Sequence, residues 1–270
     1  MVNDTIRCMK KMLLVFAHPD DESYSAAGTV AKYVKAGWQV DLLCATRGEA
    51  GHSGPYEKAG DEHLGMIRQK ELEAAATLLG ISSLTFLGYK DGKLAEEQPG
   101  ELEDKIYEKL EELIPDCIIT YDTTGISNHP DHVKICYATT FAFQKYALWV
   151  HNQLKNLKDF DEESEPKLYY ACMPKTVAQY LLKKKIIPAE SYGMPWRGTE
   201  DKFITTVISI KTLGGVKKKA LLSHISQEAE IKQFLSIKNN PLLLNEYFIL
   251  RMHGLTEVFM GKNDIVSSKL

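Results

Sequence analysis

The sequence predicts an α/β fold in three layers, with a mostly parallel central sheet and helices on both faces. Two observations lead to this prediction. Short, continuously apolar runs alternate with longer segments of helical periodicity through the first half of the chain. Such runs are typical of strands buried on both faces. Strands that alternate with helices favour parallel pairing, because each helix carries the chain back across one face of the sheet.

The elements of the first half can be placed in order. The predicted strands are residues 12–16, 39–45, 84–87 and 117–121, and the predicted helices are residues 23–36, 62–79, 102–113 and 133–149. Gly37, Gly80 and Pro115 lie at or just beyond the ends of three of these helices, where glycine and proline are favoured. The arrangement expected from this order is Rossmann-like.

The second half is less regular. A polar, acidic segment, 151–167, is expected to be a surface loop, followed by a strand at 168–172 and a loop at 187–199. A strand at 203–208 and a helix at 212–225 come next, and the last thirty or so residues give no clear pattern. We expect a single catalytic domain over residues 1–270, with residues 1–9 as a loosely ordered extension.

Composition excludes several classes of function. The chain has 270 residues, 44% hydrophobic and 26% charged, with a net charge of −3. This balance is that of a globular protein and gives no broad basic surface for nucleic acid. The apolar run Met12 to Ala17 is too short to span a bilayer, so we expect no membrane insertion and a soluble, cytoplasmic protein. The five cysteines are scattered without a CxxC motif, which favours free thiols.

Two polar clusters follow the first and fourth predicted strands. The first is His18-Pro19-Asp20-Asp21-Glu22, and the second is Asn128-His129-Pro130-Asp131-His132. In open α/β sheets ligands bind outside the carboxyl ends of the strands, so both clusters are expected to face one crevice.

The residue types in these clusters suit a catalytic metal. Histidine and aspartate are ligands for zinc, and three protein ligands with one open position are usual at catalytic zinc sites. A carboxylate left over beside the metal would act as a base. Taken singly, each cluster could instead cap a helix. The adjacent carboxylates of Asp20 and Asp21 repel each other unless a positive charge lies nearby, and a metal ion would supply it.

The two clusters resemble known motifs. Residues 14–22 resemble the opening motif of the LmbE-like (PIG-L) de-N-acetylase family, and His129 to His132 resemble its second metal motif. The resemblance covers residues 12–149, and residues 220–227 also resemble a family segment. It implies a hydrolase that removes an acyl group, typically acetyl, from the nitrogen of a glucosamine-containing small molecule. A homo-oligomer is also in keeping with it.

The resemblance also implies roles for single residues. A zinc ion, with iron(II) as the alternative metal, would be held by His18, Asp21 and His132. Asp20 would be the general base, and His129 the general acid or the stabiliser of the oxyanion. Which of the two protonates the leaving amine stays open at this stage.

The resemblance further implies substrate contacts. Arg68, on the helix after the second strand, would reach the substrate, and the loop of Arg47, Gly48 and Glu49 would line the pocket. For Arg68 and Glu49, an ion pair and a turn role are the alternatives. Side chains in loops offer further candidates, namely Tyr121, Asp122, Tyr192, Trp196 and Arg197.

Two residues near the motifs have a supporting role or an alternative explanation. Asp131 is expected to orient a ligand histidine from behind, with helix capping as the alternative. His224, near a helix end, would either approach the cleft or interact with the helix C-terminus.

Three other functions remain open from the sequence. The first is an amidase of the same family that acts on a sugar–thiol conjugate with a larger acyl group. The second is a two-histidine, one-carboxylate iron enzyme, although Asp20 has no evident task in that chemistry. The third is a Rossmann-like domain that binds a ligand without catalysis, although no glycine-rich phosphate loop follows the first strand.

Overall fold

The structure is a computed structural model that describes residues 9–56, 60–157, 160–260 and 265–270. A sheet of eight strands runs through it in the order β10-β9-β5-β4-β1-β2-β3, with β8 paired to β9. The strands of this sheet are β1 (Lys11–Phe16), β2 (Gln39–Cys44), β3 (Ser83–Phe86), β4 (Cys117–Tyr121), β5 (Lys167–Ala171), β8 (Thr206–Ser209), β9 (Asn245–His253) and β10 (Thr256–Glu257). A separate hairpin consists of β6 (Glu190–Ser191) and β7 (Met194–Pro195).

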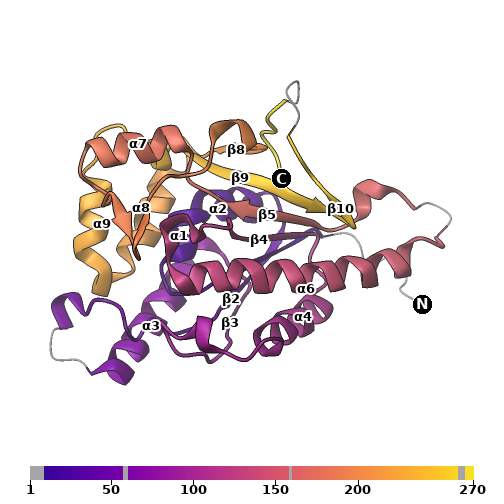
Figure 1. Ribbon diagram of the computed structural model, residues 1–270, viewed down its shortest axis with the longest axis horizontal. Coiled ribbons are helices and arrows are strands. Elements are labelled where there is room, and N and C mark those ends of the chain that lie inside the picture. The colour runs from indigo at the N-terminus through magenta and orange to yellow at the C-terminus, as the bar shows by residue number, and fades with distance from the viewer. Residues whose placement is uncertain (1–8, 57–59, 158–159, 261–264) are drawn as a thin grey trace.

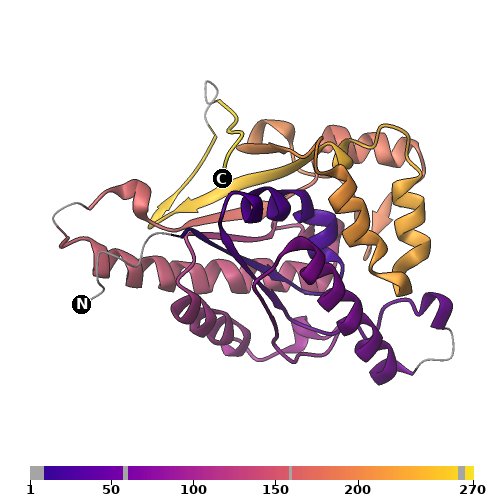
Figure 2. The ribbon, with the colours of Figure 1, turned by 180° about the vertical axis from the view of Figure 1, so that it is seen from behind.

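Helices cover both faces of this sheet. They are α1 (Asp21–Ser25), α2 (Ala27–Lys35), α3 (Asp61–Leu79), α4 (Glu101–Leu113), α5 (Gly125–Asn128), α6 (Pro130–Leu154), α7 (Lys175–Lys183), α8 (Gly214–Leu222) and α9 (Glu228–Leu235). Helices α4 and α6 lie together on the face seen in Figure 1. Helices α2, α3 and α8 lie on the opposite face, which Figure 2 shows from the front.

The predicted fold class is confirmed. Strands β1 to β5 pair in parallel, whereas β9 is antiparallel to β5, and β8 and β10 are antiparallel to β9. Strand β4 is buried at all five positions and β1 at five of its six. The two strands have continuous apolar sequences because neither face of either strand is exposed to solvent.

Several element boundaries differ from the prediction. The helix predicted at 23–36 is two helices, because Ala26 has non-helical dihedral angles between α1 and α2. Helix α6 runs to Leu154, into the predicted surface loop 151–167, because the apolar side chains of Val150 and Leu154 continue its packing against the core. Helix α7 was not expected from the sequence. Residues 1–8 of the predicted extension lie outside the described residues.

Two hydrophobic clusters fill the interior. The larger one joins both faces of the sheet to α2, α4 and α6. The smaller one lies at one end of the sheet, and it includes Met173, Leu181 and Phe234 from the segments that follow β5. Cys44, Cys117, Cys136 and Cys172 are buried free thiols. Within the part of the chain that the structure describes, no helix has the length and apolar character needed to cross a membrane.

Candidate active site

The two histidine–aspartate clusters meet because β1 and β4 are neighbours. The strands pair in parallel, with Leu14 opposite Ile119, so their carboxyl ends lie at the same edge of the sheet. Strand β2, the next along the chain, pairs with one edge of β1, and β4 pairs with the opposite edge. The strand order therefore reverses between β1 and β4, which is where open α/β sheets form a ligand crevice.

The first cluster forms a strained turn between β1 and α1. Asp20 precedes α1 with a φ of 101°, a left-handed conformation that costs energy for a residue with a side chain. The backbone N–H of Asp20 donates to Glu22 Oε2 at 3.2 Å, and that of His18 donates to Asp21 Oδ2 at 2.8 Å. These bonds within the turn hold the two neighbouring carboxylates in different directions.

The second cluster is the start of α6. His129 is the N-cap residue, Pro130 occupies the first turn, and His132 follows on the same helix. The Nδ1 atom of His132 lies 3.0 Å from the backbone oxygen of Gly125. Gly125 has a φ of 61°, and a Cβ there would lie 2.6 Å from the Cβ of His132, so the helix can approach this turn only if the position is glycine.

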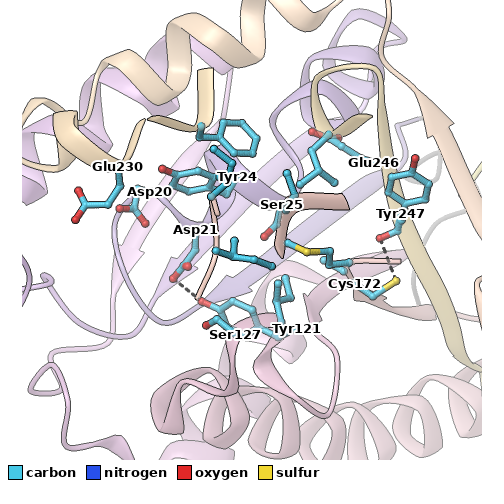
Figure 3. A pocket seen from close by; sticks show the side chains of 18 of the residues that line it. Asp20, Asp21, Tyr24, Ser25, Tyr121, Ser127, Cys172, Glu230, Glu246 and Tyr247 are labelled. Carbon is cyan, nitrogen blue, oxygen red and sulfur yellow. Dashed lines mark hydrogen bonds between the residues drawn. The ribbon is translucent and has the colours of Figure 1, made fainter. Parts of the chain in front are cut away.

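The polar atoms of the two clusters converge on one point. His18 Nδ1 lies 3.0 Å from His132 Nε2. A carboxylate oxygen of Asp21 lies 3.5 Å from His18 Nδ1, and the other lies 3.4 Å from His132 Nε2. His18 and Asp21 are each only 8% exposed. Tyr121 donates a 2.5 Å hydrogen bond to Asp21 and accepts one from Ala17, as Figure 3 shows for the first of these bonds.

Hydrogen bonding on the far side of each ring leaves the two converging nitrogens as acceptors. His18 Nε2 lies 2.8 Å from Asp91 and 3.2 Å from Asp131, so it carries a proton that it donates to these carboxylates. His132 Nδ1 donates to Gly125 in the same way. The lone pairs of His18 Nδ1 and His132 Nε2 then face each other beside a carboxylate. Only a cation or an extra proton can stabilise that arrangement.

A tetrahedral metal ion fits these three groups. With metal–ligand distances near 2.0–2.1 Å, the ligand atoms of a zinc site are separated by roughly 3.3–3.4 Å. The two histidine nitrogens are 3.0 Å apart, and the Asp21 carboxylate lies 3.4 Å from one through Oδ1 and 3.5 Å from the other through Oδ2, so the three groups are spaced close to that value. Two imidazole nitrogens and a carboxylate are also a donor set that zinc accepts. The nitrogen atoms of His18, His129 and His132 lie within 4.8 Å of one another as well.

Asp20 lies beside this point without belonging to it. Its carboxylate is 3.3 Å from Arg68 Nη2, which also donates to the backbone oxygen of Pro19 at 2.7 Å. Burial raises the pKa of Asp20 to about 7, although the Arg68 guanidinium acts in the opposite direction. A divalent cation nearby would favour the ionised carboxylate and lower this pKa.

The charges of His132, His129 and Asp21 also fit a cation site, whereas His18 itself carries the positive charge in the metal-free protein. Burial lowers the pKa of His18, but its hydrogen bonds to Asp131, Asp21 and Asp91 outweigh burial and raise this pKa. Burial lowers the pKa of His132 to about 4, and the neighbouring histidines contribute to this shift. Burial also lowers the pKa of His129, as does the charge of His18. The pKa of Asp21 is held low because the charges of His132 and His18 outweigh its burial. Neutral imidazoles and an ionised carboxylate are the forms that bind metals.

The comparisons with known proteins agree with these motifs. The family model described as PIG-L, GlcNAc-PI de-N-acetylase, matches residues 13–143. The chain is 30% identical over 244 residues to a mycothiol S-conjugate amidase of Streptomyces coelicolor, a match that covers 80% of this chain and 82% of that protein. The chain belongs to the PIG-L family.

Two further matches are a relative by sequence and a solved structure of the same fold. A probable N-acetyl-alpha-D-glucosaminyl L-malate deacetylase 2 of Bacillus anthracis is 43% identical over 124 residues, which is 46% of this chain and 54% of that protein. The N,N'-diacetylchitobiose deacetylase of Pyrococcus horikoshii, in complex with an inhibitor, has the same fold. It gives a TM-score of 0.63 at 22% identity and covers 91% of this chain and 85% of that one.

The predicted site residues of this PIG-L chain divide into two groups. His18, Asp20, Asp21, His129, Asp131, His132 and Arg68 line one cavity of about 490 Å³, which is also lined by Asp91, Gly92, His52, Tyr192 and Gln227. Arg47, Glu49 and Asp122 are outside the described lining. Arg47 is exposed and donates to Gln69 at 2.8 Å.

The residues outside the lining have structural contacts. Glu49 accepts a hydrogen bond from the backbone N–H of Asp91. Asp122 accepts from the backbone of Thr124 and Ile126 and from the side chain of Thr199, so it shapes the turn after β4. Arg47 and Glu49 were expected at the pocket from the family resemblance, and Asp122 from its loop position. None of the three is in the described lining, because each is engaged in the contacts given above.

Three residues in or near the site were missed or misread in the sequence. Asp91, in the loop after β3, reaches across the sheet edge to His18 and accepts from the backbone N–H of Ala50. Its Asp-Gly sequence looks like an ordinary turn. Tyr121 was considered as a sugar contact, but its hydroxyl donates a hydrogen bond to Asp21. His224 is buried against Glu22 at 3.1 Å, rather than lying in the cleft or at a free helix end.

Proposed function

We propose that this member of the PIG-L family hydrolyses the amide bond between an acyl group, acetyl in the simplest case, and the amino group of a glucosamine-containing small molecule. The observation that carries the proposal is the convergence of His18 Nδ1, His132 Nε2 and the Asp21 carboxylate, with a further carboxylate, Asp20, beside them. The names of the relatives support amide hydrolysis on sugar conjugates as the reaction.

The metal in this proposal is zinc, held by His18, Asp21 and His132. When bound, zinc supplies a Lewis acid for the amide carbonyl and lowers the pKa of a water molecule to about 7. Asp91 and Asp131 hold His18 from its far side, so the ring presents Nδ1 toward the metal position. Asp131 is itself fixed by the backbone N–H groups of Gly92 and Leu94. Carboxylates behind a ligand histidine fix its tautomer and raise its basicity.

Asp20 is the proposed general base. Its carboxylate is close to the converging ligands, and Arg68 holds it by a 3.3 Å contact. The Asp20 carboxylate lies beside Arg68, whereas the Asp21 carboxylate lies beside His18 and His132, so that one carboxylate can bind the metal while its neighbour accepts a proton. Once protonated, Asp20 is a donor for the leaving amine.

His129 is proposed to stabilise the oxyanion. Its Nδ1 accepts a hydrogen bond from the backbone N–H of Asp131 at 3.2 Å, so the neutral ring carries its proton on Nε2. The His129 ring stacks on that of His132 and meets that of Tyr192 edge to face, with ring centroids 4.7 Å apart in both pairs. These contacts fix the orientation of the His129 ring. A neutral N–H donor of this kind can hold a developing negative charge in a site that excludes water.

The polar cavity beside these groups suits a sugar. Arg68, Asp91, His52 and Gln227 line it together with the backbone of Gly51 and Gly92, and they offer both donors and acceptors for hydroxyl groups. Free thiols such as Cys44 and Cys117 are consistent with a reducing compartment, and we expect the enzyme to act in the cytoplasm.

The test is amine release from N-acetylglucosamine, followed by mass spectrometry, after metal analysis of each protein. We compare the wild type with Asp20→Ala and, as a control for loss of a carboxylate, with Asp104→Ala, whose exposed side chain pairs with Lys145. The proposal requires about one metal ion per wild-type chain, and an Asp20→Ala variant that keeps its metal but loses about a hundredfold or more in kcat. Wild type that binds no metal, or an Asp20→Ala variant as active as Asp104→Ala, would overturn it.

A further inference from the structure

A second cavity adjoins the proposed metal centre. It has a volume of about 440 Å³, within the usual range for ligand pockets. Asp20, Asp21, His132 and Gln227 line both this cavity and the polar one described above. The two cavities therefore meet at the reactive groups.

The walls of the second cavity are apolar. They come from α7, the loop that follows it, α9 and the segment before β9, and they include Leu181, Ile186, Ile187, Trp196, Phe234 and Leu242. Figure 3 shows the carboxylates of Asp20 and Asp21 on one side of this cavity and Cys172 and Tyr247 on the opposite side. A ligand that fills it would thus extend from the reactive groups into a hydrophobic interior.

The polar groups around this cavity are mostly paired with one another. Lys217 and Glu246 form a buried ion pair at 2.8 Å, and Lys217 also donates to the backbone oxygen of Tyr24. Trp196 differs, because its buried Nε1 has no hydrogen-bond partner among the described residues. The hydroxyl-bearing side chains of Tyr24, Ser25 and Ser127 also line the cavity, but most of its wall is apolar, which suits an aliphatic group better than a sugar.

Hydrolysis of an amide divides a molecule at the carbonyl carbon into an acyl part and an amine part. When the carbonyl is at the reactive groups, one part must enter each of the two cavities. The amine part, a sugar with several hydroxyl groups, matches the polar cavity. We infer that the apolar cavity holds the acyl part, and that this enzyme removes an unbranched aliphatic acyl group of medium length in preference to acetyl. This inference rests on the proposed function.

The reaction balances without a further reactant. The oxygen of water forms a bond with the carbonyl carbon, and the C–N bond breaks with its electron pair on nitrogen. One proton of the water passes to that nitrogen. The products are an aliphatic carboxylic acid, left in the apolar cavity, and a free amino sugar in the polar one.

The experiment measures kcat/KM of the zinc-loaded enzyme for glucosamine with N-acetyl, N-butanoyl, N-hexanoyl or N-octanoyl groups. Each methylene buried in the cavity should raise kcat/KM roughly threefold to fourfold, so that octanoyl, with its six additional methylenes, should exceed acetyl by roughly 700-fold or more if all of them are buried. Octyl N-acetylglucosaminide, which carries the same chain on the sugar instead of the nitrogen, should show no such gain.

A filled cavity provides the matched test. Ile187 is half-buried and lines the cavity, so Ile187→Trp should lower the octanoyl-to-acetyl ratio of kcat/KM at least about tenfold. Leu182→Trp is the control, because Leu182 is also half-buried, on α7, but outside the described lining. Its ratio should equal that of the wild type. A ratio measured on one preparation does not depend on how much of the variant folds.

The outcomes separate this inference from the proposed function. Hydrolysis of N-acetylglucosamine with no gain from longer acyl groups overturns the inference alone, and so does a gain for the octyl glycoside. No hydrolysis of any substrate overturns the proposed function. In that case removal of an acyl group falls with it, and calorimetric binding of octanoate tests the aliphatic-chain pocket by itself. The pocket is supported if octanoate binds and Ile187→Trp weakens the binding, and it is overturned if the two proteins bind octanoate equally or not at all.

Discussion

A substitution at Asp91 tests the proposed metal centre most directly. Asp91 lies outside both sequence motifs, and its proposed effect on metal binding acts only through His18. We expect Asp91→Asn to weaken zinc binding. The carboxylate accepts the His18 Nε2 proton at 2.8 Å, and a neutral amide in its place would leave the imidazole a poorer electron donor.

The structure sets the size of this effect. Loss of a carboxylate behind a ligand histidine typically costs ten- to a hundredfold in metal affinity, or about 1.4–2.8 kcal/mol. His18 Nε2 keeps a second carboxylate, Asp131, at 3.2 Å, so Asp91→Asn alone should lie at the lower end, about tenfold. The double variant Asp91→Asn with Asp131→Asn should lose about a hundredfold or more.

The assay is competition for zinc against a chelator of known affinity at constant pH. Asp116→Asn is the control, since Asp116 is at the other end of the sheet and pairs with Lys10. The reasoning fails if Asp91→Asn binds zinc as tightly as Asp116→Asn. It also fails if the double variant binds zinc no more weakly than either single variant, because Asp91 and Asp131 would then not both support His18 as a zinc ligand.

Three further predictions concern stability, each measured by urea unfolding of the metal-free protein. Tyr121→Phe should lower the free energy of unfolding by about 1–3 kcal/mol, because the buried backbone N–H of Ala17 loses its acceptor, and a change below about 0.5 kcal/mol would contradict this. Lys217→Met should lower the free energy of unfolding by about 3–5 kcal/mol, since it leaves the buried Glu246 carboxylate without a cation. Adding Glu246→Gln should restore part of this loss, and no restoration would argue against the ion pair. For His224, burial lowers the pKa, but the charge and hydrogen bond of Glu22 outweigh burial and raise it above the ordinary value. The stabilisation that the protonated His224 gives is then complete below pH ~6.5 and is lost as the pH rises through the folded pKa. His224→Gln should therefore lower the free energy of unfolding more at low pH than at high pH. An equal loss at both pH values would refute this prediction.

The proposed metal centre could be predicted from the sequence because each cluster is contiguous. A histidine–aspartate motif follows strand 12–16 directly and strand 117–121 after a short turn, and parallel pairing of the two strands brings the motifs together. Asp91 was not accessible, since nothing in Lys90-Asp91-Gly92 distinguishes it from a turn. Only the strand order β4-β1-β2-β3 brings that loop to His18.

The C-terminal part shows why pattern reading fails in places. Strand β9 is nine residues long, yet it was not predicted. Its buried positions include Glu246, which pairs with Lys217 and accepts from the N–H groups of Gly28 and Thr29 at the start of α2. A charged residue at a buried position breaks the apolar alternation by which a strand is identified. The expectation of one domain over residues 1–270 stays a prediction.

The reactive groups and the apolar wall of the second cavity come from different stretches of the chain. His18, Asp21 and His132 all come from the first half, inside the segment that matches the family model, whereas Leu181, Trp196 and Phe234 come from beyond it. If the proposed function and the acyl pocket are right, hydrolytic chemistry and choice of acyl group can diverge independently during evolution. For an engineer, residues 181–196 and 227–242 are the places to graft from a relative or randomise in a library, with the reactive groups left untouched.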